Sequence, residues 1–122
     1  MNYAPILLFV YNRPLHTRRC IESLLNNALA SESELFIYAD GAKDATQQEI
    51  VNDVRSYIHT IQGFKRVTFI ERGENWGLAR NIIDGVTTPE NRFGRVIVSE
   101  DDLVVAPYFL EFRNDASEIY NA

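Results

Sequence analysis

The sequence predicts an α/β domain with a mainly parallel sheet flanked by helices. Short continuous apolar runs alternate with segments of helical periodicity, which is the pattern of repeated strand–helix–strand units. Continuous apolar runs are typical of strands that are buried on both faces, as in parallel sheets. The length of 122 residues and the hydrophobic content of 46% suit one globular domain over residues 1–122.

The predicted strands and helices follow in strict alternation. The first apolar run ends at Asn12-Arg13-Pro14, where the proline suits the first position of a helix. The second helix has a capping-box pattern at Asp44 and Gln47 and a glycine stop at Gly63. The predicted strands are residues 6–11, 35–39, 67–70 and 96–99, and the predicted helices are residues 15–29, 44–62, 78–86 and 107–120.

Polar residues directly follow each of the four predicted strands. Parallel strands bring their carboxyl ends to one edge of the sheet, and open α/β sheets bind ligands at that edge. We therefore expect the four polar segments to meet in one binding site. The segments are Tyr11-Asn12-Arg13, Asp40-Gly41, residues 72–80 and Glu100-Asp101-Asp102.

The acidic triplet Glu100-Asp101-Asp102 is the strongest single feature. Three consecutive carboxylates repel one another unless a cation is near. Hard oxygen ligands suit Mg²⁺ or Mn²⁺, which one or two carboxylates usually hold together with phosphate oxygens of the substrate. The structural alternative is a helix N-terminus, where the dipole favours acidic side chains.

Asp40 and Arg80 each have two interpretations. Asp40 either forms a simple Asp-Gly turn or accepts a hydrogen bond from a nucleotide base. Arg80 follows Gly77 by about one helical turn. Its guanidinium either binds phosphate or reaches the solvent at the helix surface while its aliphatic stem packs on the helix.

Composition and missing motifs weaken several other functions. A net charge of −5 without a basic cluster argues against nucleic acid as the main partner. There is no glycine-rich phosphate loop, no dinucleotide fingerprint after the first strand and no nucleophile elbow, which argues against ATPases, NAD enzymes and α/β-hydrolases. The single cysteine, Cys20, is predicted to be a packed thiol, and His16 and His59 to be surface or boundary side chains.

The cysteine count and hydropathy also bear on location. One cysteine permits no intrachain disulfide and suits a reducing compartment. The first apolar run is too short to span a membrane and lacks the basic segment of a signal peptide. We expect a cytoplasmic protein, peripheral to the membrane in a full-length form.

Taken together, the four polar segments resemble family 2-type glycosyltransferases, which have a Rossmann-like GT-A fold. The match runs in order along nearly the whole chain. The Glu-Asp-Asp form of the acidic motif is also similar to that of the N-acetylglucosaminyltransferase I family. The matching segments are residues 5–14, 38–41, 75–81 and 96–102.

The resemblance implies a hexosyltransferase-type enzyme that binds a nucleotide-diphospho-sugar, with UDP favoured, through Mn²⁺ or Mg²⁺. A divalent ion would neutralise the charge that develops on the leaving diphosphate. The implied roles are base stacking by Tyr11 and cradling of the nucleoside by Asn12 and Arg13, base recognition by Asp40, contact on the nucleotide side by Arg80, and metal binding by Asp102 with Glu100 and Asp101 near the ribose and the metal's water shell.

The chain also departs from the family pattern. Gly-Ala follows Asp40 in place of a second acid and Gly-Ser, which leaves the base specificity open. Only 20 residues follow Asp102, whereas the acceptor site and the catalytic base of inverting members lie beyond that point in the family. The resemblance therefore implies a truncated domain, inactive alone, whose base is not in this chain and whose glycan, lipid or protein acceptor is open.

The sequence leaves three other functional classes open. A non-catalytic nucleotide-sugar binding module would suit a chain without an acceptor half. A nucleotidyltransferase or phosphatase-like enzyme would need a glycine-rich loop or an Asp nucleophile after the first strand, and a receiver-like domain would need paired acids there. An open edge of the sheet also predicts self-association.

Overall fold

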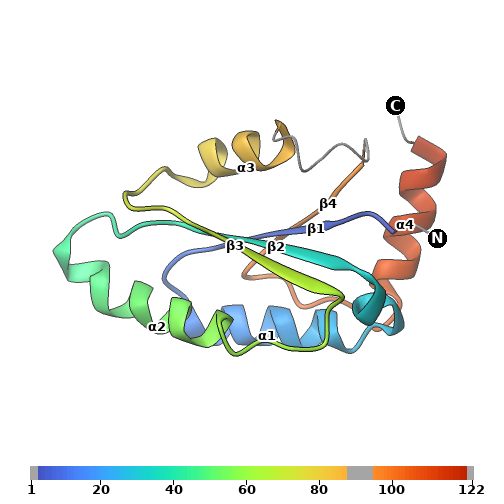
Figure 1. Cartoon of the computed structure of the whole chain (residues 1–122), viewed down its shortest axis with the longest axis horizontal. Coiled ribbons are helices and arrows are strands. Elements are labelled where there is room, and N and C mark those ends of the chain that lie inside the picture. The colour runs from blue at the N-terminus through green and yellow to red at the C-terminus, as the bar shows by residue number, and fades with distance from the viewer. Residues whose placement is uncertain (1–2, 88–94, 121–122) are drawn as a thin grey trace.

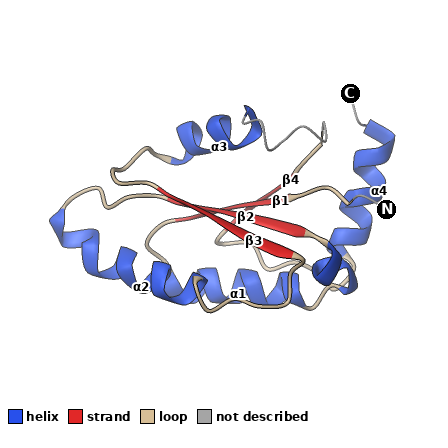
Figure 2. Cartoon of the chain, viewed as in Figure 1, coloured by secondary structure: helices blue, strands red, loops and turns tan. Residues whose placement is uncertain are grey.

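The fold is a four-stranded sheet with helices on both faces, as the computed structural model shows (Figures 1 and 2). The structure describes residues 3–87 and 95–120. Helices α1 and α2 cover one face of the sheet and α3 covers the other (Figure 1). The elements are β1 (Ile6–Val10), α1 (Pro14–Leu25), η1 (Ala28–Glu32), β2 (Glu34–Ala39), η2 (Ala45–Gln47), α2 (Gln48–Ile58), β3 (Arg66–Glu71), α3 (Leu78–Thr87), β4 (Ile97–Glu100) and α4 (Phe109–Tyr120).

All strand pairs are parallel, in the order β3-β2-β1-β4. Ile6 of β1 is paired with Leu35 of β2 on one side and with Ile97 of β4 on the other. The chain moves outward from β1 to β3 and then returns to the opposite side of β1. This reversal opens a crevice at the carboxyl ends of β1 and β4, where sheets of this type bind ligands. The predicted fold class is confirmed.

The apolar strand residues form a core on each face of the sheet. All five residues of β1 are buried. Because alternate side chains of a strand point to opposite faces, Ile6, Leu8 and Val10 pack in the larger cluster towards α1 and α2, while Leu7 and Phe9 pack in the smaller cluster towards α3. This two-sided burial is the physical reason for the continuous apolar run.

The helix predicted over residues 15–29 ends earlier, at Leu25. Its apolar spacing continues into η1, a separate 3-10 helix. Asn27 lies at the break: its side-chain amide donates to the carbonyls of Ser23 and Ala106, and its Oδ1 accepts from Leu110 N at 2.9 Å. These bonds connect the end of α1 to the start of α4, and the α-helix does not continue past them.

The capping box predicted at Asp44 and Gln47 forms only in part. Asp44 accepts from the backbone N–H of Thr46 and caps η2. The Gln47 side chain instead accepts a hydrogen bond from Asn12 at 2.7 Å, because the loop after β1 lies within its reach. Helix α2 consequently starts at Gln48, and it ends at Ile58, before Gly63.

Helix α4 lies beside the N-terminal end of the chain (Figure 1), where the Asn114 side chain accepts from Ala4 N at 2.7 Å. In the part of the chain that the structure describes, no helix is both long and apolar enough to cross a membrane. Strands β3 and β4 form the edges of the described sheet, and self-association through an edge stays a prediction.

Candidate functional site

A pocket of about 360 Å³ opens at the carboxyl ends of the strands. Seven of the eight predicted site residues line it, and Arg80 does not. The lining therefore brings together the ends of strands that lie far apart in the sequence, from Tyr11 to Asp102, as the sheet topology predicted. The seven residues are Tyr11, Asn12, Arg13, Asp40, Glu100, Asp101 and Asp102, and the remaining lining residues are Phe9, Val10, Tyr38, Lys43, Asn75, Gly77, Leu78 and Asn81.

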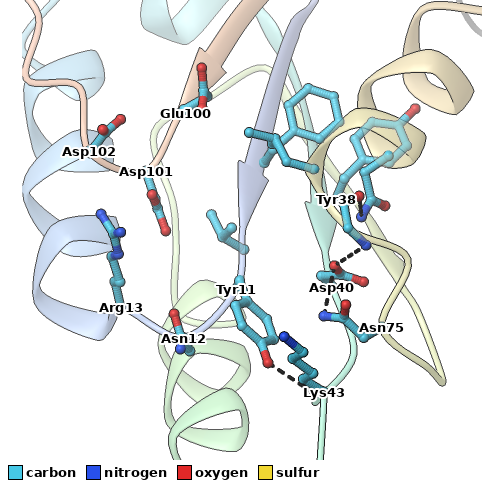
Figure 3. Close-up of a pocket in the computed structure, with 15 residues that line it drawn as sticks. Tyr11, Asn12, Arg13, Tyr38, Asp40, Lys43, Asn75, Glu100, Asp101 and Asp102 are labelled. Atoms are coloured by element: carbon cyan, nitrogen blue, oxygen red, sulfur yellow. Dashed lines mark hydrogen bonds between the residues drawn. The ribbon is translucent and has the colours of Figure 1, made fainter. Parts of the chain in front are cut away.

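The pocket has two chemically different sides. In Figure 3, the acidic triplet and Arg13 lie on one side, while Asp40 and Asn75 lie on the other. Tyr11 lies between the two sides, at the end of β1. A ligand that filled the pocket would therefore contact an acidic turn at one end and a hydrogen-bonded loop at the other.

The loop after β1 is tied to the loop after β2 by two hydrogen bonds. The Tyr11 phenolic oxygen accepts from the backbone N–H of Lys43 at 2.9 Å. The Asn12 side chain donates to Gln47. The first bond places Lys43 in the lining, a cation that the sequence analysis missed; its position after an Asp-Gly turn was the only signal.

Asp40 is buried, with 6% of its surface exposed, and protein donors surround its carboxylate. Its Oδ1 accepts from the backbone N–H groups of Gly41 at 2.9 Å and Trp76 at 2.8 Å. Its Oδ2 accepts from Gly77 N at 3.0 Å and from Asn75 Nδ2 at 3.2 Å. Asp40 thus does more than form a turn, because it binds the loop that joins β3 to α3.

Two glycines allow this loop to approach Asp40. A Cβ atom on Gly41 would lie 2.5 Å from the carbonyl carbon of Glu74, so the loop passes directly over the Gly41 backbone. Gly77 has a φ of +81°, a conformation that side-chain-bearing residues rarely adopt. The Asn75 amide also donates to the Gly41 carbonyl at 2.9 Å.

Trp76 lies between two arginines. The guanidinium carbon of Arg72 is 3.7 Å from the ring centroid, and that of Arg80 is 3.9 Å from it. Two guanidinium groups this close to one centroid do not fit on the same face of the ring. Arg80 itself lies in the first turn of α3, where it is exposed and stands outside the pocket lining.

Arg72 was not singled out in the sequence, although its segment was. Its side chain is only 11% exposed, and it forms a 2.5 Å ion pair with Asp84. Its Nε also donates to Asn81 Oδ1 at 3.0 Å. Arg72 therefore joins the end of β3 to α3 and supports Trp76 from within.

The acidic triplet forms a turn after β4. Glu100 is the last residue of β4, and its carbonyl accepts from Leu103 N at 3.1 Å. Helix α4 begins only at Phe109, so the helix-N-terminus alternative for these acids is wrong. Burial raises the pKa of Asp101, Arg13 opposes this rise, and the neighbouring Asp102 adds to it.

Cys20 lies beneath this turn, on α1. Its thiol is within 3.7 Å of Ser99 Oγ and donates to the Glu100 carbonyl at 3.4 Å. Burial raises the pKa of the thiol from 9.0 to about 11; the Ser99 hydrogen bond opposes this, and Asp101 and Asp102 add to it. The prediction of a packed thiol is confirmed.

The histidines lie at the surface, as predicted. His16 is exposed on α1. His59 has a half-exposed side chain, lies 3.1 Å from a Glu71 carboxylate oxygen and packs on the Phe69 ring.

A metal ion at this site would need ligands from the substrate. Within residues 3–87 and 95–120, no group of three or more His, Cys, Asp or Glu side chains is arranged to hold one. Asp101 and Asp102 line the pocket as adjacent carboxylates, which fits an ion held by one or two carboxylates together with phosphate oxygens. They do not fit an ion held by protein ligands alone.

Comparison with protein families agrees with this geometry. The chain matches "Glycosyl transferase family 2" over residues 6–112, a span that contains all four strands and the whole pocket lining. No curated protein matches the chain. The parallel sheet with flanking helices is consistent with the GT-A fold of this family. The chain belongs to glycosyl transferase family 2, as the order of its four polar segments predicted.

Proposed function

We propose that this glycosyltransferase domain binds a nucleotide-diphospho-sugar, with UDP as the favoured nucleotide, for hexosyl transfer to a glycan, lipid or protein acceptor. The observation that carries the proposal is the convergence of seven predicted residues on one pocket at the carboxyl edge of the sheet. Family membership supports glycosyl transfer in general. The nucleotide, the metal and the acceptor class belong to the proposal.

The nucleoside would occupy the side of the pocket formed by Tyr11 and the loop at Asn75. Tyr11 offers an aromatic ring whose hydroxyl is already held by Lys43 N, so the ring is oriented before a base arrives. The diphosphate would then extend towards Arg13 and the acidic turn, which lie on the opposite side in Figure 3.

The charge balance of the pocket favours a divalent cation with an anionic donor. Four carboxylates line the pocket against two cationic side chains, so a diphosphate alone would meet net repulsion. When bound, Mn²⁺ or Mg²⁺ supplies positive charge that stabilises the leaving diphosphate. Asp102, which is exposed in the turn, and its half-buried neighbour Asp101 are the residues that would hold the ion.

Calorimetric titration of UDP and of UDP- and GDP-sugars tests the proposal. We expect binding of UDP with Mn²⁺ and a loss of at least about tenfold in affinity with EDTA or in Asp102→Ala. Asp53→Ala is the matched control, because Asp53 is exposed on α2 and forms no part of the pocket lining. Full-strength binding in EDTA would contradict the metal assignment, and a folded chain that binds no nucleotide would contradict the donor site.

A second assay separates the transferase from a non-catalytic module. Prolonged incubation of the chain with a bound UDP-sugar should release UDP and free sugar slowly, with water as the acceptor. A donor that stays intact while fully bound would favour the binding module.

A further inference from the structure

The Asp40 carboxylate has no acceptor site left for a ligand. An ionised carboxylate offers about four lone-pair sites, and here each oxygen already accepts two N–H donors. Three of these donors, from Asn75, Trp76 and Gly77, belong to the loop between β3 and α3. A base N–H group would have to displace one of them in order to contact Asp40.

The same loop is held from its other end by Arg72. This guanidinium packs on the Trp76 ring while its polar atoms bond to Asn81 and Asp84. The two anchors are themselves linked, because Arg55 Nη2 donates to the carbonyls of Asp40 at 3.2 Å and Arg72 at 2.6 Å. The loop is therefore fixed at both ends before any ligand binds.

Two residues of this loop, Asn75 and Gly77, line the pocket beside Asp40. Figure 3 shows the hydrogen bond between Asn75 and Asp40 at the edge of the pocket. The position of this wall thus depends on the carboxylate behind it.

We propose that Asp40 is a positioning residue: it holds the Asn75–Gly77 loop as a wall of the donor pocket and acts on the nucleotide through that loop, without reading the base itself. The inference rests on the proposed function in so far as the pocket receives a nucleotide. It departs from the role of base recognition that the family resemblance implied for this residue.

The two roles differ in their dependence on the base. Uracil presents an N–H donor at the position where cytosine presents an acceptor nitrogen. A carboxylate that reads the base would favour uracil, and an amide in its place would shift the preference towards cytosine. A residue that only positions the loop affects both nucleotides by the same factor.

The experiment compares Asp40→Asn with the wild type for binding of UDP and CDP in the presence of Mn²⁺. The amide keeps the acceptor at Oδ1 but turns an NH₂ group towards two N–H donors of the loop. We expect both nucleotides to bind more weakly by the same factor, on the order of tenfold. Asp53→Asn, the same change on exposed α2, should leave both affinities unchanged.

Trp76 gives a readout that needs no nucleotide, because it is the single tryptophan of the chain. Acrylamide should quench its fluorescence more strongly in Asp40→Asn than in the wild type, as the loop moves off its anchor. Asn75→Ala removes one bond to Asp40 from an exposed position and serves as the second variant if Asp40→Asn does not fold. In the double variant, the two losses should be less than additive.

Loss of UDP binding with retained or improved CDP binding, and unchanged quenching, would overturn the inference and make Asp40 a base-reading residue. A folded wild-type chain that binds neither nucleotide would overturn the proposed function and the donor role of the loop. The quenching change alone would then establish Asp40 as the anchor of the loop.

Discussion

Each side of the pocket contains aspartate, but the aspartate of one side is bonded to the protein and those of the other side are not. Asp40 directly follows β2, Asp101 directly follows β4, and both residues line the pocket. Asp40 accepts four hydrogen bonds, whereas among the described residues no hydrogen-bond donor or ion-pair partner contacts the carboxylates of Asp101 and Asp102 within bonding distance. One side therefore has its electrostatics satisfied by the fold, and the other is available for a ligand.

This difference separates stability from binding. A carboxylate whose acceptor sites are filled by backbone N–H groups contributes to folding, since its removal leaves those donors unpaired. A carboxylate that accepts no hydrogen bond from the protein contributes little to folding and is open to a cation. Substitutions on the two sides should accordingly have unequal effects on the free energy of unfolding.

Asp40→Ala should have the largest effect. It leaves the N–H groups of Gly41, Trp76 and Gly77 without an acceptor, and we expect a loss of about 3 kcal/mol in the free energy of unfolding. Urea denaturation followed by circular dichroism measures it. Equal losses for Asp40→Ala and Asp102→Ala would contradict the contrast between the two sides.

Gly41→Ala should have the second largest effect. We expect a loss of about 2 kcal/mol in the free energy of unfolding and stronger quenching of Trp76 fluorescence by acrylamide. The added methyl group would collide with the Glu74 backbone, which cannot move while Asp40 holds the loop. Gly73→Ala is the matched control in the same loop, because its Cβ would meet no atom within 4 Å. A similar loss in both variants would mean that the loop does not lie over Gly41.

The sequence alone predicted the sheet and the convergence of the site. Strand burial follows from apolar runs, as in β1, and the carboxyl-edge rule then brings Tyr11, Asp40 and Asp101 together without any knowledge of side-chain contacts. Helix α3, predicted over residues 78–86, is observed over Leu78–Thr87, so its apolar spacing alone located it.

The contacts that distinguish the two sides could not be predicted in this way. Asp40 receives its donors from a loop more than 30 residues away, and periodicity carries no information on such pairs. Arg80 has a helical position that its spacing predicts, but its attraction to Trp76 decides where its guanidinium lies. The positions of Lys43 and Arg72 were also not predictable from periodicity. Each is held by a partner from another segment, Lys43 by Tyr11 and Arg72 by Trp76.

Cys20 is a buried residue that supports the acidic turn, because its thiol donates to the Glu100 carbonyl. Its pKa is raised from 9.0 to about 11, so the stabilisation from the buried protonated thiol is complete below pH 9 and is lost as the pH rises towards 11. We expect the wild type to exceed Cys20→Ala in the free energy of unfolding by roughly 1–2 kcal/mol at pH 8 and by much less at pH 10.5.

Urea denaturation of both chains in EDTA and a reducing agent across this pH range measures that difference. Tyr57, whose pKa is raised by burial and in smaller part by the charge of Cys20, also titrates in both chains, so the burial part of its contribution cancels in the comparison. A difference that stays constant from pH 8 to pH 10.5 would mean that the thiol has the same pKa in the folded and unfolded chains and is therefore not buried in solution.

Asp101→Asn and Asp102→Asn should have the smallest effect on folding. The neighbouring charges repel each other, and burial already raises the pKa of Asp101, so removal of one charge should leave the free energy of unfolding unchanged or raise it by about 0.5 kcal/mol. EDTA should not alter the melting temperature of the ligand-free chain, because the described residues hold no protein-only metal site. Thermal melts of both variants, with and without EDTA, check this. A clear loss of stability in either variant would show that the acidic turn, like Asp40, serves the fold.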